Sequence, residues 1–176
     1  RAFSSFFSSF HATGAATGII VEDNTGGTVT FSGTTKTLNT GANSAVSLTN
    51  NTGATVNFTG GGLDIDTTSG TGFSATGGGT VNVAGAGNSI QTSSGTALNL
   101  DTVTIGGSGI TFGTVNALGL TGNNGINLQS VTGVALTVTS GSIVHAGAGP
   151  GVVIGSATNG SGGNATIAIG TDIFSA

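Results

Sequence analysis

The sequence predicts an all-β fold, a parallel β-helix (β-solenoid) of about six three-sided coils of about 25–28 residues, and we expect it to be right-handed. Two observations predict it. Short segments such as 55–58, 63–66 and 72–75 alternate apolar and other residues, which is the period of a strand with one buried face. Glycine-rich corners separate these segments, and the whole unit recurs at a nearly constant spacing.

One segment of the unit has the form small, apolar, any, apolar. Its copies begin at Gly18, Ala45, Gly72, Ala97, Gly125 and Gly151. Self-similarity at a period of this size is typical of repeat architectures. The 35 glycines and the lack of an i, i+3, i+4 pattern argue against helical repeats.

A second segment recurs in step with the first. Its copies begin at Thr28, Thr55, Thr80, Thr102, Ala135 and Thr166, and its inward positions are Val29, Val56, Val81 and Val103. Short alternating strands also suit an antiparallel sandwich. Like residues at like positions in successive units favour the solenoid, in which each segment stacks on its own copy.

Length predicts a single domain, residues 1–176, with an atypical phenylalanine-rich segment at 1–12. This segment contains Phe3, Phe6, Phe7 and Phe10. Terminal repeats of solenoids are commonly atypical, so these rings either plug the end of the core or pack on a neighbouring molecule.

The unit is most regular between residues 18 and 100. Asn24 and Asn51 occupy equivalent corners of successive units, and stacked asparagines can hydrogen-bond amide to amide along the rod. Beyond Asp101 the corners become uneven, and the chain ends on an apolar turn with Ile167, Ile169, Ile173 and Phe174.

Charge and composition exclude several functions. Charged residues make up 5% of the chain, Arg1 and Lys36 are the only basic residues, and the net charge is -4. Nucleic-acid binding needs a basic footprint, which is missing, and no apolar run is long enough for a membrane-spanning helix. The chain contains neither Cys nor Met, and we expect a processed product that is secreted to the cell exterior or surface.

Catalysis is not expected. Asp64 and Asp66 leave the same strand on the same side, about 7 Å apart by strand rise. A polysaccharide-active enzyme of this fold would need further carboxylates or a basic residue beside them, whereas Asn39 and Gln91 stand at the neighbouring positions. We therefore predict no enzymatic activity, no cofactor and no metal site.

A regular threonine array is a second candidate site. Thr28, Thr30, Thr55, Thr80, Thr102 and Thr104 flank the inward valines. An array of this kind resembles the Thr-x-Thr face of solenoid antifreeze proteins and implies an ice-binding alternative, although threonine is also a common exposed strand residue.

The repeats also resemble those of large bacterial secreted and surface β-helix proteins of the adhesin or autotransporter type. The resemblance is carried by the phrases at 48–53, 58–65 and 95–100 and covers the chain from about Gly14 onward. It implies an extracellular structural or adhesive role, and the phenylalanine-rich start departs from it.

The functional prediction is a structural protein whose rods stack end to end into a fibre. An open β-helix exposes strand edges and core at both ends, and here the predicted mating residues are Phe3, Phe6, Phe7, Phe10, Ile167, Ile169, Ile173 and Phe174. The expected partner is the protein itself, with surface glycans or other cells as further candidates. The alternative is a stalk segment of a large adhesin, whose own further repeats would cover the ends.

Overall fold

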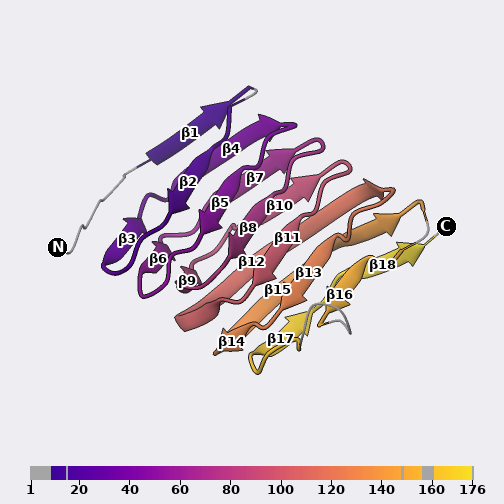
Figure 1. The fold of residues 1–176 in the computed structure, drawn as a ribbon. Helices are drawn as coiled ribbons and strands as arrows, with labels where there is room; N and C mark the ends of the chain where they lie inside the picture. Colours follow the sequence, from indigo (N-terminus) through magenta and orange to yellow (C-terminus); the bar gives the residue numbers. More distant parts are fainter. Residues whose placement is uncertain (1–8, 15, 148, 156–160, 176) are drawn as a thin grey trace.

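The computed structural model describes residues 9–14, 16–147, 149–155 and 161–175, which form a rod of coiled strands (Figure 1). Every pairing between the named strands is parallel, and no described residue is helical. The strands belong to one 12-stranded and one 6-stranded sheet. The predicted all-β parallel solenoid of about six coils is confirmed.

The six-stranded sheet forms one side of the rod, which we call face 1. Its strands pair in the order β16, β13, β11, β8, β5, β2, so each joins its own copy one coil away. They are β2 (Ile19–Glu22), β5 (Val46–Thr49), β8 (Phe73–Thr76), β11 (Leu98–Asp101), β13 (Ile126–Gln129) and β16 (Val152–Ile154). We number coils 1 to 6 from these strands.

The 12-stranded sheet covers the other two sides, because two long strands, β12 (Thr104–Leu120) and β15 (Ala135–His145), continue from one side to the next. Face 2 also contains β3 (Thr28–Phe31), β6 (Thr55–Phe58), β9 (Thr80–Val83), β14 (Thr132–Gly133) and β17 (Thr166–Ile169). Face 3 also contains β1 (Ser9–Thr13), β4 (Thr35–Gly41), β7 (Leu63–Thr67), β10 (Ser89–Thr92) and β18 (Asp172–Ser175).

Register along face 1 agrees with the predicted repeat. Val46 pairs with Phe73 and Phe73 with Leu98, while Leu98 pairs with Ile126. Because side chains alternate between the two sides of a strand, this register keeps every inward residue above an inward residue.

The predicted position of the second segment in coil 4 is wrong by two residues. Thr80 pairs with Thr104, not Thr102, and Val81 pairs with Ile105, not Val103. The chain turns at Thr102, whose φ is 57°, and the strand begins only after Val103. Past Ile105 a bulge shifts the register before Ile110 meets Val83, and Ser108 donates its backbone N–H to Asn82 Oδ1 at 3.0 Å.

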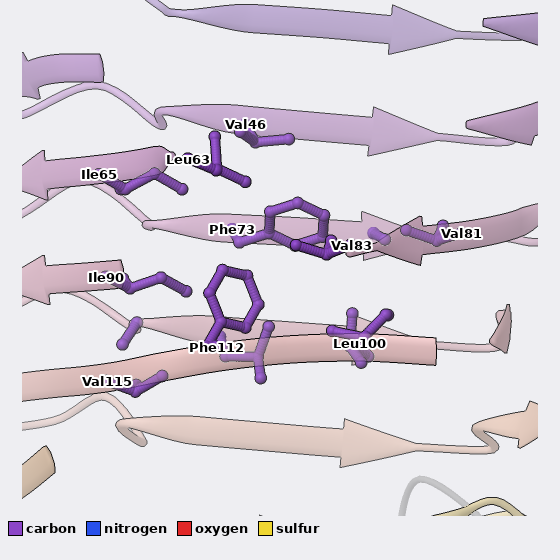
Figure 2. Close-up of a cluster of buried hydrophobic side chains, with 14 of the residues drawn as sticks. Val46, Leu63, Ile65, Phe73, Val81, Val83, Ile90, Leu100, Phe112 and Val115 are labelled. Carbon is purple, nitrogen blue, oxygen red and sulfur yellow. The ribbon is translucent and has the colours of Figure 1, made fainter. Parts of the chain in front are cut away.

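The core is a continuous column of aliphatic and aromatic side chains between the three faces (Figure 2). Phe58, Phe73 and Phe112 are fully buried. The ring of Phe73 lies edge-on between the other two, with centroids 5.6 Å and 5.7 Å away, an arrangement that the ring quadrupoles favour. Phe31 stacks on Phe58 from coil 1.

The corner after face 1 begins with the same backbone conformation in every coil. One residue with positive φ follows each strand of this face: Asp23, Asn50, Gly77, Thr102, Ser130 and Gly155. Glycine, aspartate and asparagine tolerate this region, whereas it strains a β-branched residue such as Thr102. The residue types at this position vary, so the sequence repeat locates the corner but does not show which of its residues has positive φ.

Polar side chains stabilise the corners through hydrogen bonds to neighbouring side chains and backbone carbonyls. The predicted Asn24–Asn51 contact is confirmed, since Asn24 Nδ2 donates to Asn51 Oδ1 at 2.8 Å and Asn51 Nδ2 donates to Val21 O at 2.8 Å. At the corner after face 3, the hydroxyls of Thr40, Thr67 and Thr92 each donate to the carbonyl three residues on.

Candidate functional site

The last coil presents core positions to solvent. Ile173 pairs with Ile143, yet Ile143 is fully buried and Ile173 is 55% exposed. Ile167 and Ile169 pair with buried Leu136 and Val138 and are only partly buried against the core. Phe174 pairs with Val144 on the outer side of the strand and is 53% exposed. The structure thus brings the four predicted C-terminal mating residues into coil 6.

The strands of coil 6 have backbone N–H and C=O groups on their outer edge that no further described strand pairs with. Within the described residues, β16 pairs only with β13, and β17 and β18 pair only with β15. Beyond Asp101 the chain has one charged residue, Asp172. This end therefore combines unpaired backbone groups with exposed apolar side chains and little charge, features that natural edges usually avoid.

At the other end, strand β1 pairs with β4 and has no second neighbour among the described residues (Figure 1). Phe10 belongs to β1, and its Cα lies opposite that of Lys36. Phe3, Phe6 and Phe7 lie outside the described residues, so their predicted contribution to this end stays a prediction.

The carboxylates of Asp64 and Asp66 lie on the outer side of β7, and Asn39 and Gln91 pair with Asp66 as the repeat predicts. Burial raises the pKa of Asp66, and the neighbouring Asp64 raises it further. Asp64 Oδ1 accepts a hydrogen bond from Ser89 Oγ at 2.7 Å. The side chains at the paired positions are hydroxyls and amides, which suit a hydrated structural surface.

The threonine array differs from the prediction at Thr102 and Thr104. Thr28, Thr55, Thr80 and Thr104 form one in-register column on face 2, which Thr132 extends. Thr30 begins a second column, but Asn57 and Asn82 continue it, and Thr102 lies at a corner outside both. The face is therefore one threonine column beside a mixed one.

Sequence reasoning missed the role of Lys36, which is 1% exposed and points into the rod. Its Nζ donates to three backbone carbonyl oxygens: Gly33 O, Thr59 O at 3.0 Å and Gly61 O at 2.5 Å. Burial lowers the pKa of this amine. Two coils on, Asn88 serves the same corner, since its Nδ2 donates to Gly85 O and Thr111 O.

Among the described residues, no three His, Cys, Asp or Glu side chains gather closely enough to hold a metal ion. No helix that could cross a bilayer occurs in the described part of the chain.

Comparison with known proteins adds no identity. No protein-family model, curated protein or solved structure matches the chain. The resemblance to bacterial surface β-helix proteins therefore rests on the residues alone, and of what it implies the structure shows the β-solenoid fold.

Proposed function

We propose that this protein is an extracellular structural subunit, a β-solenoid rod that stacks head to tail with copies of itself into a fibre. The observation that carries the proposal is the exposure of core positions in coil 6, above all Ile173, beside strand edges that lack a second neighbour among the described residues.

A second copy is the partner that suits this end best. Ile19 in coil 1 and Val152 in coil 6 belong to the same inward column of face 1. All strands run parallel, so coil 1 of one copy placed on coil 6 of another continues both the column and the hydrogen-bond ladder. Addition of strands to an exposed edge is a common route to assembly, and a heterologous contact that does not close gives an open filament.

The sides of the rod fit the same role. They present hydroxyls, amides and few charges, so little electrostatic repulsion opposes close approach of copies. The proposal includes no catalytic activity, because Asp64 and Asp66 have amide and hydroxyl neighbours in place of a general acid, base or cation.

Assembly can be measured by sedimentation velocity and negative-stain electron microscopy across a concentration series. We expect filaments whose width is that of one rod. The variant Ile173→Lys places a charge in the contact and should leave single rods, whereas Leu118→Lys, at a side position that is 47% exposed, should still form filaments. Single rods of the unmodified protein at every concentration would refute the proposal.

A further inference from the structure

A hollow of about 280 Å³ lies on the outer side of face 1. It spans coils 3 to 5 at the start of strands β8, β11 and β13. Its walls are almost wholly polar and include Thr71, Thr96, Asn99, Asn123, Asn124 and Asn127.

An insertion in coil 4 builds one wall of this hollow. Thr92 pairs with Ala117 and Leu98 pairs with Ile126, so the chain between these two pairings is longer by three residues in the later coil. The extra residues therefore fall between Ala117 and Ile126, where the loop that carries Asn123 and Asn124 stands out from the rod. Asn123 Nδ2 contacts Ser94 O at 3.4 Å, which ties the loop to the preceding coil.

The floor of the hollow is a ladder of carboxamides held in one orientation. Asn127 Nδ2 donates to Asn99 Oδ1 at 2.8 Å, and Asn99 Nδ2 donates to Ser74 Oγ at 3.2 Å. Gln129 Nε2 donates to Asn127 Oδ1 at 3.0 Å. Gln129 is 2% exposed, and its Oε1 has no hydrogen-bond partner in the described structure.

The two carboxamides of this ladder that line the hollow, Asn99 and Asn127, keep hydrogen-bonding capacity for a ligand. A primary amide has two N–H donors and an oxygen with two lone pairs, and the ladder uses one N–H of Asn99 and one of Asn127. The remaining groups sit beside the hydroxyls of Thr71 and Thr96. The result is a fixed set of donors and acceptors with no charged side chain in the lining.

We propose that this hollow binds a neutral sugar unit of a polysaccharide or glycan. Sugar hydroxyls donate and accept at once, which matches amides and hydroxyls. Apolar ligands and nucleobases need apolar or aromatic walls, and the lining contains none. A volume near the lower end of the usual range for ligand pockets, about 300–1,000 Å³, suits a single sugar unit.

The test is an NMR titration of the protein with neutral trisaccharides built from glucose, mannose or N-acetylglucosamine. A trisaccharide of galacturonic acid and free glycerol serve as comparison ligands. With at least one neutral trisaccharide, we expect saturable shifts of the side-chain amides of Asn99 and Asn127 and of the backbone amide of Asn123. The comparison ligands should give no saturation.

The chain offers a matched pair of variants. On face 2, Asn57 Oδ1 accepts a hydrogen bond from Asn82 Nδ2 at 2.8 Å, and Asn57 Nδ2 donates to Thr30 Oγ1 at 3.4 Å. Asn99 makes the same two contacts, with Asn127 and Ser74. Asn99→Ala should weaken sugar binding about tenfold, and Asn57→Ala should leave it unchanged. Asn123→Ala changes a lining residue in an exposed loop, where the substitution should not affect folding. It should also weaken sugar binding.

No saturable shift with any neutral trisaccharide, or equal binding by Asn99→Ala, Asn123→Ala and the unmodified protein, would overturn the proposal. So would saturation by glycerol, because the hollow would then have no preference for a sugar. The result is independent of fibre formation, since the hollow lies on the side of the rod and the titration is made on single rods of Ile173→Lys.

Discussion

Coils 4 and 5 and coil 6 place apolar side chains in the same inward column, but only those of coils 4 and 5 are shielded from solvent. Ala117 and Ile143 are fully buried, whereas Ile173, next in the same column, is 55% exposed. Residue type does not explain the difference in exposure, because Ile143 and Ile173 are both isoleucines. A coil of this rod is therefore buried by the coil that follows it, and coil 6 needs such a neighbour.

The largest expected effect tests this comparison directly. Phe73→Ala removes a fully buried ring between Phe58 and Phe112 and should lower the free energy of unfolding by about 3–5 kcal/mol. Ile173→Ala, in single rods, should lower it by less than about 1 kcal/mol, because half of the side chain is already in water. Urea unfolding followed by circular dichroism measures both.

Equal losses for these two variants would contradict the comparison, since they would show that coil 6 is as closed as coil 3. A larger loss of unfolding free energy for Ile173→Ala at concentrations where fibres form would support the view that coil 6 is incomplete in single rods. In that case the neighbouring copy would supply the missing burial.

A second prediction concerns Lys36, the amine that is buried between coils 1 and 2. Lys36→Met keeps the aliphatic stem but leaves the carbonyls of Gly33, Thr59 and Gly61 without their donor. We expect a loss of about 1–3 kcal/mol near neutral pH, the typical cost of buried groups left unsatisfied. Urea unfolding again measures it, and a variant as stable as the unmodified protein would show that water reaches these carbonyls.

The pH dependence of stability isolates the same amine. Burial lowers the pKa of Lys36 in the folded state, so between that pKa and the ordinary one of lysine the unfolded chain binds more protons. Stability should therefore rise with pH across this window. The chain has no other lysine and no Tyr or Cys, and an α-amino group has lost its proton by about pH 9. The rise should therefore vanish in Lys36→Met when unfolding is compared from about pH 9 to about pH 11.

The smallest expected effects compare one corner in coils 3 and 4. Thr102→Gly should raise the free energy of unfolding by about 0.5–1 kcal/mol, because a β-branched residue is strained at φ 57°. Gly77→Ala at the equivalent corner should lower stability, since φ is 73° and an added Cβ would collide with Asn50 Oδ1. The same sign for both, measured by thermal unfolding, would contradict the view that these corners share one backbone conformation.

The strands and inward columns could be predicted from sequence because burial enforces a period of two, and stacking enforces a period of one coil. Val56, Phe58, Leu63, Ile65 and Phe73 are all buried as the alternation requires. The Asn24–Asn51 ladder could be predicted for the same reason, since both residues occupy equivalent corners.

The features that could not be predicted from sequence depend on local insertions and on the two ends of the rod. The repeat places Thr102 in the column of Thr80, but in the structure Thr104 takes that place, and a bulge follows at Gly106–Gly109. The sequence does not show this shift, because Thr-Val-Thr at 102–104 has the pattern expected of the strand itself. The alternation with Leu38 and the equivalence to Leu63 do place Lys36 at an inward position. What the sequence does not indicate is how the amine is satisfied there, because its partners are backbone carbonyls from two coils. The widest spacing of the repeat, from Ala97 to Gly125, is consistent with the insertion beside the hollow, but the sequence analysis did not predict the insertion or its polar lining.

Hydrogen exchange resolved by residue, in dilute and in concentrated solution, tests the central claim most directly. We expect that amides of β17 and β18 exchange fast in dilute solution and become protected as fibres form, while those of β8 stay protected throughout. Strong protection of β18 in dilute single rods, or fast exchange of β18 within fibres, would contradict it.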